Sequence, residues 1–368
     1  MTLRNWLAPV VVAAAVACRR DGGGDPLPPG DYTPRPTEHD LPVARENRER
    51  IRGDALRRAK VWLPPKAPIT AVDFTRNPEG PGDFPTDAVV PCRFELKSSG
   101  GRTPKFQCIA PGGDVLKVKY GHNNPETFGE VAATRLVSAL GFGADRMFVV
   151  ARVRCFGCPS HPYPKVRIFD ALRTDWSRAV DFEMAVIERR LEGLEIEGGW
   201  GWPELSAIDP AAGGSTRAEV DALKLLAIFL NNWDAKPVNQ RLMCAGSAPS
   251  CDKPIAYMQD LGQTFGPRSI DLEGWSRTPV WADPAACRVS MRGLPWEGAT
   301  FADAAISEEG RLFLAGLLRQ LTPAQVRDLF TAARFTEFFR NRDAADVDAW
   351  TRAFESRVAQ IADRSPCP

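Results

Sequence analysis

The chain has little histidine, lacks three common catalytic motifs and carries almost no net charge, and each shortage excludes a class of protein. Its three histidines, His39, His122 and His161, leave few candidates for a histidine-based triad. The patterns G-x-x-x-x-G-K-[ST], H-E-x-x-H and G-x-S-x-G are missing, which argues against P-loop, zinc-protease and α/β-hydrolase chemistry. The formal net charge is +1 with no basic stripe, so we expect no nucleic-acid partner.

The N-terminus has the pattern of an export signal. Arg4 precedes an apolar run from Leu7 to Ala17, which is too short to span a bilayer, and Cys18 follows. Residues 15–18 read Ala-Val-Ala-Cys and are similar to a bacterial lipobox, although Ala stands where Leu is usual. We expect an exported lipoprotein, periplasmic or at the cell surface and anchored in the membrane through Cys18. A plain signal peptide with an unrelated cysteine is the alternative.

The composition then divides the chain. Residues 19–68 are rich in proline, glycine and charge, which predicts a disordered tether after the signal of residues 1–18. The remainder, about 300 residues, has enough apolar content for one large or two smaller cores.

Cysteine usage favours disulfides. Apart from Cys18 the chain has an even number of cysteines, which in an exported protein predicts pairing. They are Cys92, Cys108, Cys155, Cys158, Cys244, Cys251, Cys287 and Cys367.

Two pairs follow from spacing. Cys92 and Cys108 are equidistant from Gly100 in a strand–turn–strand pattern, so a hairpin should place them opposite each other. Cys244 and Cys251 flank a short loop. The Cys155-x-x-Cys158 motif lacks the following helix of a thioredoxin, because prolines follow it. A zinc site formed by these last four cysteines is the alternative to disulfides.

The first half of the folded region is predicted to be rich in strands. Residues 92–96, 106–109 and 115–120 alternate as a three-stranded meander. Gly100 and Gly101 lie in its first turn and would let the backbone approach a phosphate, while Lys117 and Lys119 share one face of its third strand. An amphipathic helix should follow over residues 125–140 and carry Glu130.

Strand-like segments continue and then give way to helices. Residues 146–154 and 180–191 have strand character. Helices are expected over residues 217–231, 311–321, 323–335 and 347–361, and a strand over residues 255–259.

The most informative segment is Asp234-Ala235-Lys236-Pro237-Val238-Asn239, which has the form D-x-K-P-x-N. It places a carboxylate and an amide oxygen five residues apart, which suits proton acceptance from a hydroxyl beside a metal-bound triphosphate. Asp260-Leu261-Gly262 follows the strand at 255–259 as a sharp turn.

With these motifs in this order, the chain resembles the protein-kinase-like superfamily. The helix Glu130-Val131-Ala132-Ala133-Thr134-Arg135-Leu136 is similar to the E-x-A-A-x-x-L helix of its atypical branch, and Asp260-Leu261-Gly262 is similar to D-F-G. That branch includes phosphatidylinositol kinases, HipA-like toxin kinases and secreted Golgi kinases. The resemblance implies an α+β, bilobal fold, with a small β-rich N-lobe at residues 69–190 and a larger, mainly helical C-lobe at residues 191–368.

The resemblance also implies roles. Lys119, or Lys117 as the alternative, would hold the nucleotide phosphates and pair with Glu130. Asp234 would position the acceptor hydroxyl and Lys236 would stabilise the transferred group. Asn239 and Asp260 would bind magnesium beside ATP or another nucleotide. The implied function is transfer of a γ-phosphoryl group to a hydroxyl of a protein, lipid or small molecule.

Several departures from the family pattern keep other functions open. Trp233 stands where many kinases have Arg, no His precedes the loop, and residues 98–101 are not a full glycine-rich loop. An inactive kinase-like protein that binds a nucleotide or a partner is therefore one alternative. A small-molecule phosphotransferase similar to aminoglycoside kinases is another. The Gly- and Trp-rich turn at residues 198–203 would either line the cleft or pack a loop.

Overall fold

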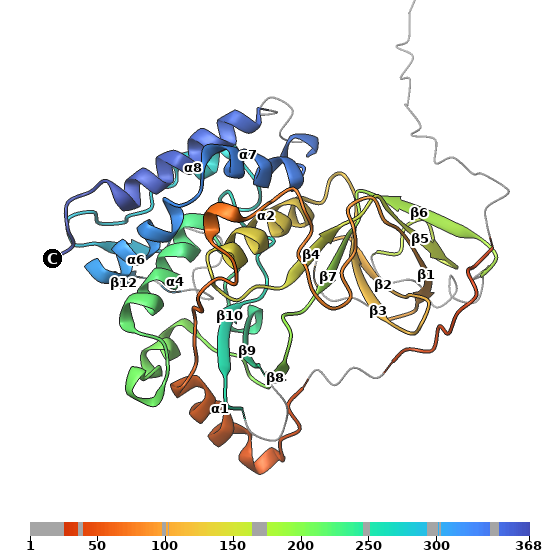
Figure 1. Cartoon of the computed structure of the whole chain (residues 1–368), viewed down its shortest axis with the longest axis horizontal. Helices are drawn as coiled ribbons and strands as arrows, with labels where there is room; N and C mark the ends of the chain where they lie inside the picture. Colours follow the sequence, from red (N-terminus) through yellow and green to blue (C-terminus); the bar gives the residue numbers. More distant parts are fainter. Residues whose placement is uncertain are drawn as a thin grey trace, which may run out of the picture.

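The structure, a computed structural model, is a mixed α+β protein whose strands and helices lie largely in separate parts of the molecule. It describes residues 26–35, 40–97, 101, 103–163, 175–245, 251–292, 301, 303–338 and 346–368. Figure 1 shows the larger sheet at one end, helices α4, α6 and α8 at the other, and α2 between them. Cys18 and Gly100 lie outside the described residues.

A seven-stranded sheet in the order β4-β7-β3-β2-β1-β5-β6 forms the strand-rich part. Its strands are β1 (Val89–Glu95), β2 (Lys105–Ile109), β3 (Val115–Lys119), β4 (Arg146–Val149), β5 (Arg152–Phe156), β6 (Ala179–Glu183) and β7 (Val186–Arg189). The meander β1-β2-β3 is antiparallel, and β5 pairs with β1 in parallel. The meander expected from the sequence is therefore present.

The strand expected over residues 146–154 is two strands. β4 pairs with β7, whereas β5 pairs with β1 and β6 near the other edge of the same sheet. The chain turns between them, where the amides of Ala151 and Arg152 both donate to the carbonyl of Ala88. Val150 lies in the turn and is fully buried, so the sequence stays apolar there. The sequence pattern therefore does not reveal the break between the two strands.

Seven α-helices are the main elements outside this sheet in the described chain. They are α1 (Arg48–Arg57), α2 (Pro125–Ala139), α4 (Arg217–Leu230), α5 (Leu272–Arg277), α6 (Glu308–Leu318), α7 (Pro323–Ala332) and α8 (Val347–Ala362). The ends of α4 and α7 follow from sequence, since Thr216 with Glu219 and Thr322 with Gln325 form capping boxes. α2 packs against both β4 and α7 and so joins the sheet to the helices.

A three-stranded antiparallel sheet, β10-β9-β8, has its central strand directly after the D-x-K-P-x-N loop, and α4 precedes the loop. Its strands are β8 (Leu194–Ile196), β9 (Gln240–Cys244) and β10 (Pro254–Met258). A two-stranded sheet of β11 (Arg288–Ser290) and β12 (Asp303–Ala305) lies among the helices. In the part of the chain described here, no helix is long and apolar enough to cross a membrane.

The N-terminal segment differs from the disordered tether expected over residues 19–68. Its described residues, 26–35 and 40–68, are ordered: the carbonyl of Tyr32 accepts a hydrogen bond from Arg93, Asp40 bridges Glu195, and Lys60 bridges Ile255, with α1 between the last two in sequence. Leu56 and Val61 are buried in the same core as α4 and α6. The charged residues of this segment obscured the few apolar ones, which occur at the positions that face the core.

A buried arginine closes the end of α4. Arg357 of α8 donates to the carbonyls of Ile228 and Phe229 in the last turn of α4, and to those of Trp275 and Thr278. Burial lowers the pKa of Arg357 to about 9. The charge suits the negative end of the helix dipole, and it fixes the point at which the chain enters the Asp234 loop.

The eight cysteines other than Cys18 form four disulfides: Cys92–Cys108, Cys155–Cys158, Cys244–Cys251 and Cys287–Cys367. This pairing uses the four cysteines of the alternative zinc site, so that alternative is wrong. Cys92 and Cys108 are bonded but not directly opposite, because β1 and β2 align Phe94 with Cys108. Four disulfides fit an oxidising, exported environment.

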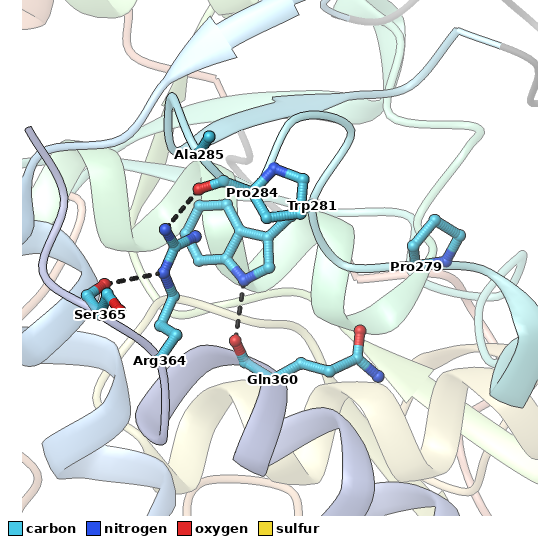
Figure 2. Close-up of a pocket in the computed structure, with 7 residues that line it drawn as sticks. All are labelled: Pro279, Trp281, Pro284, Ala285, Gln360, Arg364 and Ser365. Carbon is cyan, nitrogen blue, oxygen red and sulfur yellow. Dashed lines mark hydrogen bonds between the residues drawn. The ribbon is translucent and has the colours of Figure 1, made fainter.

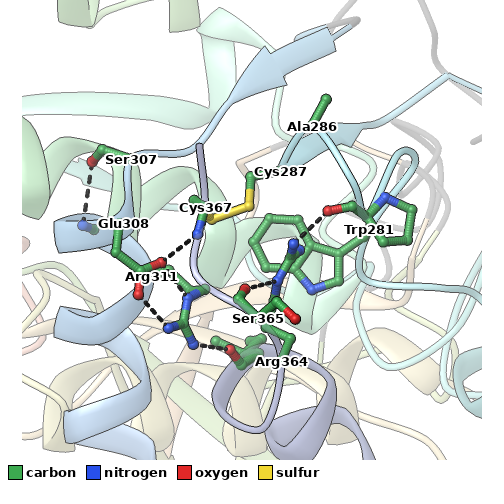
Figure 3. The surroundings of a disulfide bond; sticks show 12 residues. Trp281, Ala286, Cys287, Ser307, Glu308, Arg311, Arg364, Ser365 and Cys367 are labelled. Atoms are coloured by element: carbon green, nitrogen blue, oxygen red, sulfur yellow. Dashed lines mark hydrogen bonds and ion pairs between the residues drawn. A yellow bond between two sulfur atoms is a disulfide. The ribbon is translucent and has the colours of Figure 1, made fainter.

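The disulfide Cys287–Cys367 ties the C-terminus to the start of β11 (Figure 3). Beside it, Glu308 accepts a hydrogen bond from the amide of Cys367 and pairs with Arg311, while Arg364 lies over the ring of Trp281 at 4.4 Å. The bond spans 80 residues, against 3 for Cys155–Cys158.

This difference in loop length predicts unequal contributions to stability. Replacing Cys287 and Cys367 with Ala should lower the free energy of unfolding by about 4 kcal/mol, because the unfolded chain regains a long loop's entropy. The same change at Cys155 and Cys158 should cost about 2 kcal/mol or less. Urea unfolding of both double variants measures this, and an equal loss would contradict the loop-entropy explanation.

Candidate active site

Lys119 is the most deeply buried charged group of the strand-rich part. It ends β3, its exposed fraction is 1%, and its Nζ bonds to Glu130 on α2. The strand and the helix are brought together because Val118 and Val131 lie in the cores on either side of the sheet. The lysine and the glutamate that the sequence suggested as partners therefore form a direct ion pair.

Two further carboxylates surround the same ammonium group. Lys119 Nζ lies 3.2 Å from Glu126 on the first turn of α2 and 3.2 Å from Glu188 on β7. Lys117, the alternative to Lys119, lies 2.6 Å from Glu188 and its side chain is 33% exposed. Lys117 therefore shares Glu188 with Lys119, but its side chain lies nearer the surface of the protein.

Burial and mutual repulsion set the charge of this cluster. Burial raises the pKa of Glu130 to about 8, against the attraction of Lys119 and with added repulsion from Glu188, Asp260 and Glu126. Although burial opposes it, attraction to Lys119 holds the pKa values of Glu126 and Glu188 at about 2. The pKa of Lys119 lies well above its usual range, since three glutamates offset its burial. Lys119 is therefore positively charged, and its pair with Glu130 becomes a full ion pair as Glu130 loses its proton near pH 8.

The Asp234 loop is held together by its own residues. Lys236 Nζ lies 2.6 Å from Asp234 Oδ1, and Asn239 Nδ2 donates to the carbonyl and the Oδ2 of Asp234, at 2.7 and 3.2 Å. Pro237–Asn239 forms the short 3₁₀ helix η5. Burial and the charge of Asp260 raise the pKa of Asp234, whereas Lys236 and Asn239 lower it. The raised pKa makes Asp234 a better proton acceptor.

Asp260 connects this loop to the lysine cluster. The amides of Gln259 and Asp260 donate to the carbonyl of Asn239 at 2.9 and 3.5 Å, so the two segments lie backbone to backbone. The charge of Asp260 also acts on Lys119, on Glu130 and on Asp234. The residues suggested by the sequence thus converge around Asp260.

The turn at Asp260-Leu261-Gly262 packs directly on α2. A Cβ on Gly262 would lie 2.1 Å from Glu126 Cγ, and one on Gly129 would lie 2.9 Å from the Gly262 carbonyl oxygen. Thr264 completes the contact by donating to the carbonyl of Leu261. Only glycine lets Asp260 come this close to the helix that carries Glu126 and Glu130.

Asn239 and Asp260 carry oxygen donors of the type that magnesium prefers. Asn239 uses its amide nitrogen on Asp234, which leaves its amide oxygen as a hard donor, and the backbones of Asn239 and Asp260 are in contact. Among the described residues no group of three or more His, Cys, Asp or Glu side chains is arranged to hold a metal. Magnesium usually takes one or two protein carboxylates and completes its shell with phosphates and water, so two donors suffice.

The sequence missed three buried acids near the site: Glu126, Glu188 and Asp145. Asp145 precedes β4 and accepts hydrogen bonds from the amide of Leu191, the hydroxyl of Tyr257 and the side chain of Gln259, at 2.9, 2.9 and 3.0 Å. Burial and repulsion from Glu188 raise the pKa of Asp145 to about 6. It links the β7–β8 connection to the residue before Asp260, and no local motif marks it.

The remaining expected site residues lie nearby or elsewhere. Gly101 has φ of +91°, and a Cβ there would meet Lys105 Nζ at 2.8 Å; Lys105 in turn lies 3.7 Å from Glu126. A cavity of about 400 Å³ lies at the other end of the chain, lined by Trp281, Gln360 and Arg364 among others (Figure 2). It contains none of the residues of the Lys119 cluster or the Asp234 loop.

Comparison with known proteins finds only distant similarity, and only among solved structures. No protein-family model and no curated protein matches the chain. Among solved structures, the crystal structure of a Helicobacter pylori proinflammatory kinase, CtkA, is similar at 12% sequence identity and a TM-score of 0.39. The match covers 73% of this chain and 99% of that one. No conclusion is drawn from a similarity this distant.

The raised pKa of Glu130 predicts a pH-dependent stability. The pKa of Glu130 is about 8 in the folded state, whereas the usual pKa of a glutamate is 4.5. Between pH 4.5 and pH 8, the folded state therefore binds a proton that the unfolded state does not. The free energy of unfolding of the wild type should therefore fall from pH 5 to pH 8. Glu130→Gln should reduce the fall by at least about 1 kcal/mol.

Urea unfolding at pH 5, 6.5 and 8 measures the effect. Glu79→Gln, at an exposed position, is the control and should keep the wild-type slope. A slope that is unchanged in Glu130→Gln would show that Glu130 is ionised throughout this range.

The contact of Gly262 with Glu126 predicts a steric effect. Gly262→Ala should destabilise the protein by about 1–3 kcal/mol, because the added methyl group forces a buried side chain aside. Gly316→Ala is the matched control, since nothing lies within 4 Å of its added Cβ on α6, and it should be neutral or stabilising. Thermal unfolding compares them, and equal melting temperatures would contradict the packing described.

Proposed function

We propose that the chain has a bilobal protein-kinase-like fold and is an exported phosphotransferase that moves the γ-phosphoryl group of a nucleotide, ATP in the first instance, to a hydroxyl acceptor. The observation that carries this proposal is the ion pair between Lys119 and Glu130, with Asp260 acting electrostatically on that pair and on Asp234. Few other chemistries require a buried lysine–glutamate pair together with the groups of the two loops, which are the carboxylates of Asp234 and Asp260 and the amide of Asn239.

Each residue then has a chemical task. Lys119 orients the phosphates of the nucleotide, and Glu130 aims and charges Lys119. Asn239 and Asp260 hold magnesium, which neutralises phosphate charge when it is bound. Asp234 accepts a hydrogen bond from the acceptor hydroxyl and takes its proton, and Lys236, 2.6 Å from Asp234, faces the transferred group.

The division of the chain follows from this proposal. The N-lobe is the seven-stranded sheet with α2, and the C-lobe holds the remaining helices and the smaller sheets. Residues 190–193 connect the lobes. Residues 40–60 belong with the C-lobe, because Asp40 bridges β8 and Lys60 bridges β10. We assign the chain to the atypical branch of the superfamily, and its export and membrane anchoring to the signal that ends at Cys18.

One observation favours a second function, an inactive kinase-like protein that binds a nucleotide or a partner. Lys119 is 1% exposed and is already paired with three glutamates, so phosphate oxygens reach it only after a carboxylate moves. A protein fixed in this arrangement would bind partners at its surface without transferring a phosphoryl group.

Phosphoryl transfer and nucleotide binding, measured together, separate these functions. Wild type with magnesium and γ-labelled ATP should label itself or an acceptor from a panel of proteins, lipids and sugars. Asp234→Asn should reduce the rate at least 100-fold and retain nucleotide binding, because only proton transfer and acceptor orientation are lost. Asp209→Asn, at a surface 3₁₀-helix cap, is the matched control and should keep the wild-type rate.

Two results would change the assignment. Nucleotide binding by wild type and Asp234→Asn without transfer to any acceptor would replace the enzyme with the binding protein. No shift in melting temperature of the wild type with ATP and magnesium, or with other nucleotides, would overturn both.

A further inference from the structure

The Gly- and Trp-rich turn at residues 198–203 lies directly under the Asp234 loop. It follows β8, and Trp202 opens the 3₁₀ helix η3 (Trp202–Ala207). Gly199 has φ of +54°, and a Cβ there would lie 2.3 Å from the carbonyl oxygen of Gln240, the residue at which the loop enters β9. The turn therefore packs the loop closely and does not line an open cleft.

Trp202 reaches the centre of the loop. Its indole nitrogen donates to the carbonyl of Ala235 at 2.8 Å, and the side chain of Gln240 donates to the same oxygen at 3.1 Å. Ala235 stands between Asp234 and Lys236, and it is buried, as are Trp202 and Gln240. Two buried donors on one carbonyl fix the peptide plane between the two charged residues of the loop.

The outer side of the loop is exposed. Pro237 is exposed and Val238 is 66% exposed, although the carbonyl of Val238 accepts a hydrogen bond from Arg241 of β9 at 2.7 Å. The backbone bonds from Gln259 and Asp260 to Asn239 anchor the far end of the loop. Trp202 and Gln240 anchor the peptide next to Asp234.

We propose that Trp202 is a positioning residue of the active site, which through its indole N–H holds the Ala235 carbonyl and thereby aims Asp234 and Lys236 at the acceptor and the transferred group. This inference rests on the proposed phosphotransferase function for its catalytic part. Its structural part, the anchoring of the loop by one indole, stands independently of the reaction.

The neighbouring tryptophan provides a matched control. Trp200 is buried like Trp202, the two rings contact each other edge to face at 5.1 Å, and its indole nitrogen donates to the carbonyl of Arg241 at 3.0 Å. Arg241 lies in β9, outside the loop. Trp200→Phe and Trp202→Phe therefore remove the same group from the same cluster, and only the second removes a bond to the loop.

The test combines two measurements on the full chain. Hydrogen–deuterium exchange reports on the loop without any need for activity, and steady-state phosphoryl transfer from ATP reports on its alignment. Trp202→Phe should accelerate exchange of the peptide that covers residues 234–240 and lower kcat about tenfold with an unchanged KM for ATP. Trp200→Phe should leave that peptide's exchange and kcat within about twofold of wild type.

The outcomes are separable. If Trp202→Phe accelerates exchange of the loop and Trp200→Phe does not, the anchoring by Trp202 is supported. This holds even if the wild type transfers no phosphoryl group, a result that would contradict the proposed function but not the anchoring. Equal effects of the two variants on loop exchange would make Trp202 a core residue and overturn the inference. Unchanged kcat in Trp202→Phe, with transfer by the wild type, would overturn the positioning role.

Discussion

The burial of one ammonium group, that of Lys119, is the constraint on which the arrangement of the molecule depends. A lysine this far from water remains charged only if carboxylates offset the lost hydration, and here three glutamates do so. They come from the first turns of α2 and from β7, two elements that are distant in sequence. The charge therefore fixes how the helix sits on the sheet. If α2 moved away, Lys119 would lose Glu126 and Glu130 and would keep only Glu188 of the three.

The position of α2 also constrains the Asp260 turn, because two glycines allow the turn and the helix to pack closely. Gly262 and Gly129 allow the Asp260 turn to contact α2, so the position of the helix determines the position of Asp260. Asp260 in turn is hydrogen bonded through its backbone to Asn239. A continuous set of packing contacts and hydrogen bonds thus connects Lys119, α2, the Asp260 turn and the Asp234 loop.

The sequence predicted those parts of the fold that depend on local pattern. The meander, α2, α4 and the C-terminal helices are marked by periodicity and by caps such as Thr322 with Gln325, and the structure confirms them. The pairing of Lys119 with Glu130 was predicted from a family motif. Glu188 and Asp145 were missed because their roles depend on strand pairing and on burial, which bring distant residues together. The sequence did not predict α1 because this segment has few apolar residues, and their role as core residues is evident only from the elements that they pack against.

The described segments before residue 69 are part of the folded unit. Asp40 and Lys60 bridge β8 and β10, the two edge strands of the small sheet, and Leu56 and Val61 fill core positions. A shortened chain that starts at residue 69 would expose those edges and leave that part of the core open. Farther toward the N-terminus, Tyr32 is buried and its carbonyl accepts a hydrogen bond from Arg93 of β1. The folded unit therefore includes chain well before the first strand of the large sheet, and part of that chain packs on the sheet itself.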